Sequence, residues 1–140
     1  MPDGKDILNH KVKHRESWRP FAASVMRQHM NEWFDIDYDS PFMLLAAEVR
    51  SDKRKKIPSV VHVDNSCRLQ SLTKTDNGRY FDLVSEFNAV TGVPLILNTS
   101  FNLGGDPIVE TPAEAIECFL KTKMDYLVVE DYILSKKPAK

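Results

Sequence analysis

Apolar and polar positions along the chain fall into runs that predict alternating strands and helices. An unbroken apolar run, Val93–Leu97, ends in a polar cluster formed by Asn98, Thr99, Ser100 and Asn102. A run that is apolar at every position suits a strand covered on both faces of an α/β sheet, where ligands bind at the carboxyl ends of strands. The short polar side chains can hold a polar ligand, phosphate included, or can cap their own turn. The pattern alone leaves these two interpretations open.

Further strands are predicted on both sides of this run. Phe42–Val49 is apolar and of strand length, which predicts a second buried strand. Residues 59–72 alternate around Asp64–Asn65 and predict a β-hairpin, and residues 126–130 and 132–134 predict closing strands. The polar side chains that would share one face of the hairpin are His62, Asp64, Arg68 and Gln70. Such a face either lines a cleft or is a solvent-exposed sheet face on which side chains pair across the strands.

Helical spacing of apolar residues appears in four places. Residues 6–12 predict a short helical turn, and Val25–Phe34 predicts an amphipathic helix. Gly78–Val90 predicts a helix that ends at Gly92. Thr111–Glu114 is a capping box with proline at the first helical position. The apolar residues that the helix after this box is expected to bury are Ala115, Ile116, Phe119 and Leu120. Helices and strands that alternate in this way indicate a single α/β or α+β domain.

Composition narrows the class of protein. The chain has 140 residues, of which 42% are hydrophobic and 28% charged, as in ordinary soluble domains. A net charge of −1 gives no global argument for nucleic-acid binding. Cys67 and Cys118 show no metal-ligand spacing, so we expect free thiols and no protein metal site. The sequence shows neither a secretory signal nor an apolar run of membrane-spanning length, which predicts a cytoplasmic protein.

Two segments concentrate positive charge. The first places five potential cations within nine positions: Lys11, Lys13, His14, Arg15 and Arg19. Solvated surface is the simplest interpretation, but Pro20 and the apolar run 21–23 predict an extended segment that enters the core. Because arginine forms forked contacts with phosphate or carboxylate oxygens, an anion site is the alternative. The second segment, residues 51–57, predicts a solvated loop, with an RNA patch at 53–56 as the less favoured interpretation.

Four segments together carry a resemblance to a known family: Lys13–Ala22, His62–Gln70, Asn98–Asn102 and Pro107–Pro112. In this order they resemble the carboxyl-terminal domain of the O-carbamoyltransferase family, which includes the nodulation protein NodU and antibiotic carbamoyltransferases. The resemblance extends from about Lys5 to Lys136, nearly the whole chain. It implies a YrdC-like fold, a twisted mixed sheet flanked by helices, with residues 1–140 forming one domain.

The resemblance also implies an activity and a site. In such a fold, ATP and carbamoyl phosphate give carbamoyl adenylate and pyrophosphate, and the carbamoyl group then passes to an acceptor hydroxyl. The residues that would face the phosphates as a catalytic cationic cluster are Lys13, Arg15 and Arg19. Those that would bind nucleotide or carbamoyl phosphate are Arg50, Arg68, Asn98, Ser100 and Asn102. Positioned cations are what this chemistry requires, because an oxyanion has to approach an anionic phosphorus centre. Mg²⁺ is expected on the triphosphate, held mostly by phosphate oxygens and water.

Two parts of the family pattern have no counterpart in this sequence, and they leave three hypotheses open. The metal-dependent amino-terminal catalytic domain is absent, as is the upstream part of the family domain itself. The chain is then either part of a carbamoyltransferase that needs a separate amino-terminal domain as partner, or a non-catalytic module that binds nucleotide or carbamoyl phosphate. RNA binding by residues 53–56 is the third hypothesis, and the acceptor molecule and the oligomeric state stay open.

Overall fold

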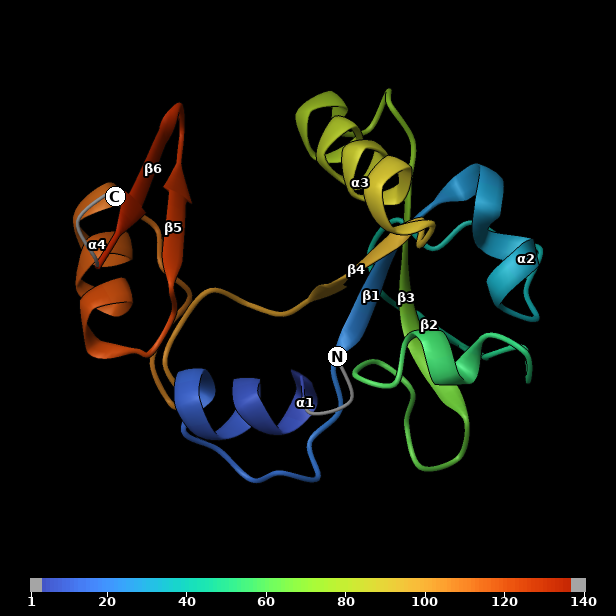
Figure 1. The fold of residues 1–140 in the computed structure, drawn as a ribbon, viewed down its shortest axis with the longest axis horizontal. Coiled ribbons are helices and arrows are strands. Elements are labelled where there is room, and N and C mark those ends of the chain that lie inside the picture. Colours follow the sequence, from blue (N-terminus) through green and yellow to red (C-terminus); the bar gives the residue numbers. More distant parts are fainter. Residues whose placement is uncertain (1–3, 137–140) are drawn as a thin grey trace. The chain divides into compact units, whose positions relative to one another are not determined.

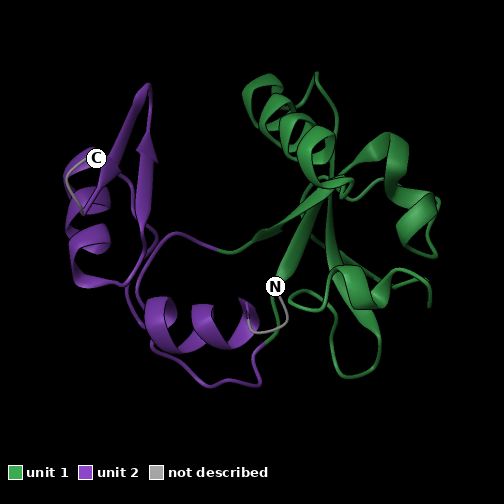
Figure 2. Ribbon diagram, viewed as in Figure 1, with its two compact units in different colours: residues 1–2, 20–99 green, residues 3–19, 100–140 purple. Residues whose placement is uncertain are grey.

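The structure is a computed structural model that describes residues 4–136. The chain forms two compact units, which are coloured separately in Figure 2. Unit 1 contains Pro20–Thr99, and unit 2 contains the described residues of Asp3–Arg19 and Ser100–Lys140. Strands and helices are mixed along the chain, so the predicted α+β class is confirmed.

Unit 1 is built on a four-stranded mixed sheet (Figure 1). Its strands are β1 (Ala22–Met26), β2 (Leu45–Glu48), β3 (Ser66–Leu72) and β4 (Leu95–Asn98), in the spatial order β2-β3-β1-β4. β1 and β3 are parallel, with Ser24 opposite Gln70, whereas β2 and β4 pair antiparallel with β3 and β1. All five residues of β1 are buried, because this strand lies inside the sheet.

Helices pack on the sheet of unit 1. The core of this unit consists of two clusters, which the sheet separates. The helical segments are the 3-10 helix η2 (Arg27–His29), α2 (Met30–Trp33), the 3-10 helix η3 (Arg54–Lys56) and α3 (Gly78–Thr91). Met30 and Trp33 of α2 join the larger cluster with Val25. Val84 of α3 packs with Met26 in the smaller cluster. Neighbouring residues of β1 therefore point to opposite faces, as strand geometry requires.

Unit 2 joins the beginning of the chain to its end. Its elements are α1 (Gly4–Ile7), the π-helix η1 (Leu8–Lys13), α4 (Pro112–Lys121), β5 (Tyr126–Val129) and β6 (Tyr132–Ser135). β5 and β6 form an antiparallel hairpin, with Leu127 opposite Leu134. Leu127 packs with Ala115 and Phe119 of α4, and these three residues form the core of unit 2.

The strongest local signals in the sequence predicted their elements correctly. Asn77 caps α3 by accepting a hydrogen bond from the backbone N–H of Tyr80, and Gly92 ends the helix at φ 70°. The capping box of α4 is present, since Thr111 and Glu114 each accept a hydrogen bond from the other's backbone N–H. The turn at Asp64–Asn65 and the closing hairpin are also confirmed.

Two of the expected elements are wrong in extent or partner. The helix expected over Val25–Phe34 is interrupted, because Val25 and Met26 belong to β1 and pair with β3. The hairpin expected over 59–72 has only its second arm as a strand, and that arm lies between β1 and β2. Long-range pairing overrode the local pattern in both places.

Burial was overestimated along the apolar runs. β4 was expected to be covered on both faces, but only Leu95 is buried and the other three residues are partly exposed. β2 is an edge strand, and Phe42 and Leu44 before it are about four-fifths exposed. In α4, Ile116 and Leu120 are exposed, and Cys118 is buried instead. An apolar run thus indicated a strand correctly without revealing its place in the sheet.

The helices of the described part are short for a lipid bilayer. None within residues 4–136 combines the length and apolar character that a membrane crossing requires.

The capping box yields a stability prediction. We expect Thr111→Ala to lower the free energy of unfolding by about 1 kcal/mol, because the backbone N–H of Glu114 loses its acceptor. Thr111→Ser keeps the hydroxyl and should retain most of the stability. Urea denaturation followed by circular dichroism measures both variants, and equal midpoints for the two would contradict the prediction.

Candidate functional site

The ammonium group of Lys13 is the centre of the polar structure in unit 2. Lys13 is 3% exposed, and its Nζ donates to the backbone oxygen of Ser100, to the backbone oxygen of Asn102 at 3.1 Å and to Asn102 Oδ1 at 2.9 Å. A fourth contact, to Ser100 Oγ, is longer at 3.5 Å. Three ammonium hydrogens thus meet four oxygen acceptors from one short segment. Three of the residues that the resemblance assigns to the site, Lys13, Ser100 and Asn102, are therefore in direct contact.

No carboxylate is among these acceptors of Lys13, so its charge is solvated by dipoles rather than neutralised. Burial, with a smaller contribution from the nearby Arg15 guanidinium, lowers the pKa of Lys13, while the Cys118 thiol opposes the shift. The influence of Arg15 means that two cations lie close enough to repel each other. An anion placed beside them would relieve this repulsion.

The loop that receives Lys13 is held by its own hydrogen bonds. Ser100 Oγ donates to Asn102 Oδ1 at 2.7 Å, and Asn102 Nδ2 donates to the backbone oxygen of Asp106 at 2.7 Å. Gly104 N donates to the backbone oxygen of Lys13 at 3.1 Å. A Cβ built on Gly104 would lie 2.5 Å from that oxygen, so only glycine fits at this approach.

Asn9 is a site residue that the sequence analysis missed. It is fully buried at the start of η1, and its Oδ1 accepts from Arg15 Nε at 2.8 Å. Its Nδ2 donates at 3.1 Å to the backbone oxygens of both Ser17 and Arg19. One amide thereby fixes the segment that presents Arg15. The available signal was a lone asparagine in a weakly patterned helical turn, which carries no information about its partners.

Arg19 lies at the surface of the same unit. Its Nη1 is 3.7 Å from Glu16 Oε2, and both side chains are at least half exposed. Exposed pairs of this kind contribute little to stability, so the guanidinium can exchange this partner readily.

The remaining predicted site residues belong to unit 1. Asn98 Nδ2 donates to Ser24 Oγ at 2.8 Å and to Gln70 Oε1 at 2.9 Å, and Ser24 Oγ donates to Gln70 Oε1 at 2.8 Å. Ala22 lies opposite Asn98 on one side and opposite Arg68 on the other, so all three share one sheet face. The exposed Arg68 side chain has no hydrogen bond or ion pair within the described residues.

Arg50, beyond the end of β2, already has protein partners. Its Nε donates to the backbone oxygen of Asn31 at 2.7 Å, and its Nη2 is 3.7 Å from Asp35 Oδ1. In the basic loop, Lys53 and Lys56 lie 5.4 and 6.0 Å from the ring centre of Trp33, and Arg54 pairs with Glu48. Within the described part of the chain, no three His, Cys, Asp or Glu side chains are grouped as metal ligands.

Comparison with known proteins identifies the family of the chain. Residues 1–136 match the family described as Carbamoyltransferase C-terminus. Nodulation protein NolNO of Sinorhizobium fredii is 42% identical over 96% of this chain and 20% of its own length. An uncharacterized protein of Synechocystis is 40% identical over 94% of this chain and 25% of its own length. Nodulation protein U of Rhizobium tropici is 37% identical over 83% of this chain and 20% of its own length.

The chain spans about a fifth to a quarter of the length of these relatives. The family match, in contrast, covers almost the whole chain. This protein therefore belongs to the carbamoyltransferase C-terminal domain family.

Proposed function

We propose that the chain binds ATP and carbamoyl phosphate and forms carbamoyl adenylate, from which the carbamoyl group goes to an acceptor hydroxyl. The observation that carries this proposal is the contact of Lys13 Nζ with Ser100 and Asn102, across 87 and 89 residues of sequence. It joins the basic motif and the Ser-x-Asn motif of the family resemblance in one place. The closeness of Arg15 adds a second positive charge there.

The chemistry explains why cations and neutral donors are sufficient. A carbamate oxygen attacks the α-phosphorus of ATP, the bond to the bridging oxygen breaks, and pyrophosphate leaves with the electron pair. Release of carbamate from carbamoyl phosphate consumes one water and yields inorganic phosphate. No side-chain nucleophile is needed, because positioned positive charge offsets the repulsion and stabilises the leaving group. Mg²⁺ would add charge through phosphate oxygens and water.

The roles follow from the contacts. Arg15, oriented by Asn9, and the exchangeable Arg19 would contact phosphate oxygens, and Lys13 would set the Ser-x-Asn loop and supply charge beneath it. The longest contact of the Lys13 ammonium group, to Ser100 Oγ, is the one that a phosphate oxygen would replace.

For the unit 1 residues Arg50, Arg68 and Asn98, anion contacts stay a prediction. Arg68 is the strongest of the three, because its guanidinium has no partner within residues 4–136.

Transfer to the acceptor is proposed to require more than this chain. The relatives are several times longer, and a separate amino-terminal domain is the expected partner. The alternative, a module that binds nucleotide or carbamoyl phosphate without catalysis, would bind the same ligands but release no pyrophosphate.

The first prediction from the proposed function concerns ATP binding. Arg15→Ala and Asn102→Ala should each weaken ATP binding about tenfold to hundredfold, the cost of losing a charge-assisted hydrogen bond. Lys123→Ala removes an exposed charge of the same unit and should leave binding unchanged. Isothermal titration calorimetry measures the affinities. If neither substitution weakens binding, the site is misplaced.

Pyrophosphate release in the presence of ATP, Mg²⁺ and carbamoyl phosphate separates the two hypotheses. We expect release to depend on carbamoyl phosphate and to fall in both variants. Tight binding without release would support the non-catalytic module.

A second prediction uses the close approach of Gly104 to Lys13. Gly104→Ala should lower ATP affinity about tenfold or more, since the added methyl group displaces the backbone that positions Lys13. Gly78→Ala is the matched control, because a Cβ there meets no atom within 4 Å. Equal affinities of the two variants in calorimetry would show that the approach is not needed for binding.

The third prediction is a pH dependence. The pKa of Lys13 is lowered from 10.5, and a bound phosphate would raise it again, so binding should take up protons as pH rises through the lowered value. Affinity should be highest below that pKa and decline above it. Calorimetry in buffers of different ionisation enthalpy measures the proton uptake. Lys13→Met should abolish it, and unchanged uptake in that variant would assign the proton to another group.

A further inference from the structure

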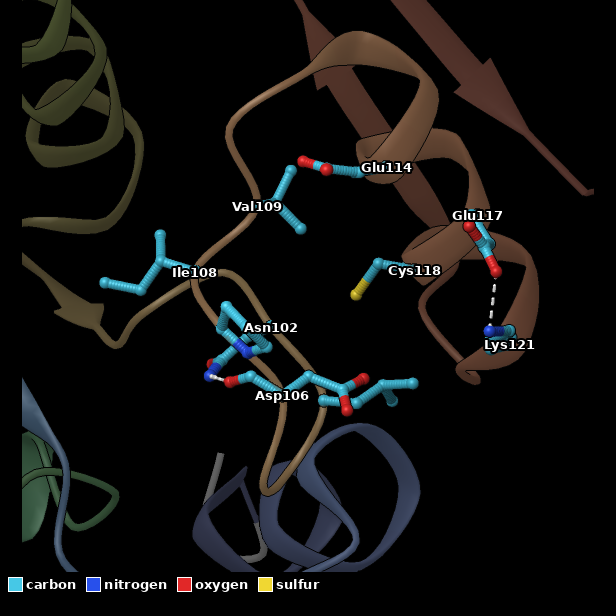
Figure 3. Close-up of a pocket in the computed structure, with 10 residues that line it drawn as sticks. Asn102, Asp106, Ile108, Val109, Glu114, Glu117, Cys118 and Lys121 are labelled. Atoms are coloured by element: carbon cyan, nitrogen blue, oxygen red, sulfur yellow. Dashed lines mark hydrogen bonds and ion pairs between the residues drawn. The ribbon is translucent and has the colours of Figure 1, made fainter.

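A small hollow lies in unit 2 between α4 and the loop that carries Asn102 (Figure 3). Its volume is about 210 Å³, which corresponds to roughly seven water molecules at ~30 Å³ each. Pockets that enclose drug-sized ligands start near ~300 Å³, so this hollow suits a single ring system and not a whole nucleotide.

The walls of the hollow are apolar on one side. Leu103, Pro107, Ile108 and Val109 line it from the loop. Val109 packs against the core of unit 2 and its side chain points inward in Figure 3. An apolar wall of this kind favours the face of an aromatic ring.

A thiol closes the opposite side. Cys118 is 7% exposed, and its Sγ points into the hollow in Figure 3. The thiol makes no hydrogen bond within the described residues. Burial raises the pKa of Cys118, which keeps the group protonated and able to donate a weak hydrogen bond at neutral pH.

The charges around the hollow are mainly negative. Glu117 is paired with Lys121 at 2.6 Å, and Glu114 is engaged in the capping box. The Asp106 carboxylate has neither a hydrogen bond nor an ion pair among residues 4–136. Such a lining disfavours phosphate and favours a group that donates a hydrogen bond.

We propose that this hollow receives the base of the nucleotide, an aromatic ring whose exocyclic amine donates to Asp106. Adenine offers this amine next to a ring nitrogen that can accept from the Cys118 thiol. The inference rests on the proposed ATP binding and adds the location and selection of the base.

Asn102 separates the base from the phosphates. Its Oδ1 accepts from Lys13 and Ser100, its Nδ2 donates to the backbone oxygen of Asp106, and Asn102 is one of the residues that line the hollow. The ring would therefore lie on one side of this amide and the cations on the other, the order that a nucleotide has along its own length.

Adenosine and inosine test the proposal without any phosphate. Inosine carries an oxygen in place of the amine, and this oxygen would face the Asp106 carboxylate. We expect adenosine to bind the wild-type chain about tenfold or more tightly than inosine, since the Asp106 carboxylate loses its donor and meets an oxygen instead. Isothermal titration calorimetry measures both. Equal affinities, or no binding of adenosine, would overturn the proposal.

Substitutions then locate the nucleoside. Asp106→Asn should reduce the preference for adenosine, because the new amide can also donate to the oxygen of inosine. Asp125→Asn, which neutralises an exposed carboxylate of the same unit outside the hollow, should preserve it. An unchanged preference in Asp106→Asn would exclude the carboxylate from recognition.

Filling the hollow gives an independent test. Cys118→Leu places methyl groups where the thiol points and should remove most adenosine binding, whereas Cys118→Ala should keep it. If circular dichroism shows that Cys118→Leu does not fold, the comparison of Asp106→Asn with Asp125→Asn tests the proposal instead. Adenosine binding with no pyrophosphate release would refute the proposed activity alone, and pyrophosphate release without adenosine selectivity would refute this inference alone.

Discussion

Unit 2 depends on the burial of one ammonium group. Taking a lysine charge out of water is costly unless its hydrogens are paired. Lys13 meets this requirement with oxygens from a segment that lies almost ninety residues further along the chain. The loop from Ser100 to Asp106 therefore adopts a conformation that turns two backbone carbonyls toward one point. Gly104 permits the approach, since no side chain fits against the backbone of Lys13 there.

The same arrangement is the physical basis of the proposed binding of an anionic ligand. A buried lysine paired with a carboxylate would be electrically neutral to its surroundings. Here the partners of Lys13 are carbonyl, amide and hydroxyl oxygens, and Arg15 adds a second cation nearby. The charge is solvated without being cancelled, so it continues to act on neighbouring groups. In the proposed function, structural burial and anion binding would therefore depend on the same group.

Local signals in the sequence correctly predicted helix ends, which depend on a few neighbouring residues. The end of α3 followed from Gly92 and the start of α4 from the capping box, because each signal acts within one helical turn. The strand at 22–26 shows the limit. Val25 has helical spacing to later apolar residues, but the sheet is decided by pairing with residues 68–72. Sequence spacing cannot report such a partner.

The same limit applies to the candidate site. The Ser-x-Asn motif and the basic segment could be recognised because they combine several polar residues in a short stretch. Asn9 and Gly104 could not, because their importance lies in the path of the chain around them. Asn9 has a role only because the backbone turns back at His14, whose φ is 50°, and brings Arg15 within reach. A single asparagine or glycine in sequence does not disclose that turn.

Asn102 shows how few orientations such a site allows. Its Oδ1 has to face Lys13 and Ser100 Oγ, since a rotation of the amide by half a turn would place its NH₂ group against the ammonium. The Nδ2 group is thereby directed to the backbone oxygen of Asp106. One of its two hydrogens is used in that bond, and the position of the other is fixed by the planar amide. The buried lysine therefore determines the orientation of the Asn102 amide and, through it, a hydrogen bond to the loop backbone at Asp106.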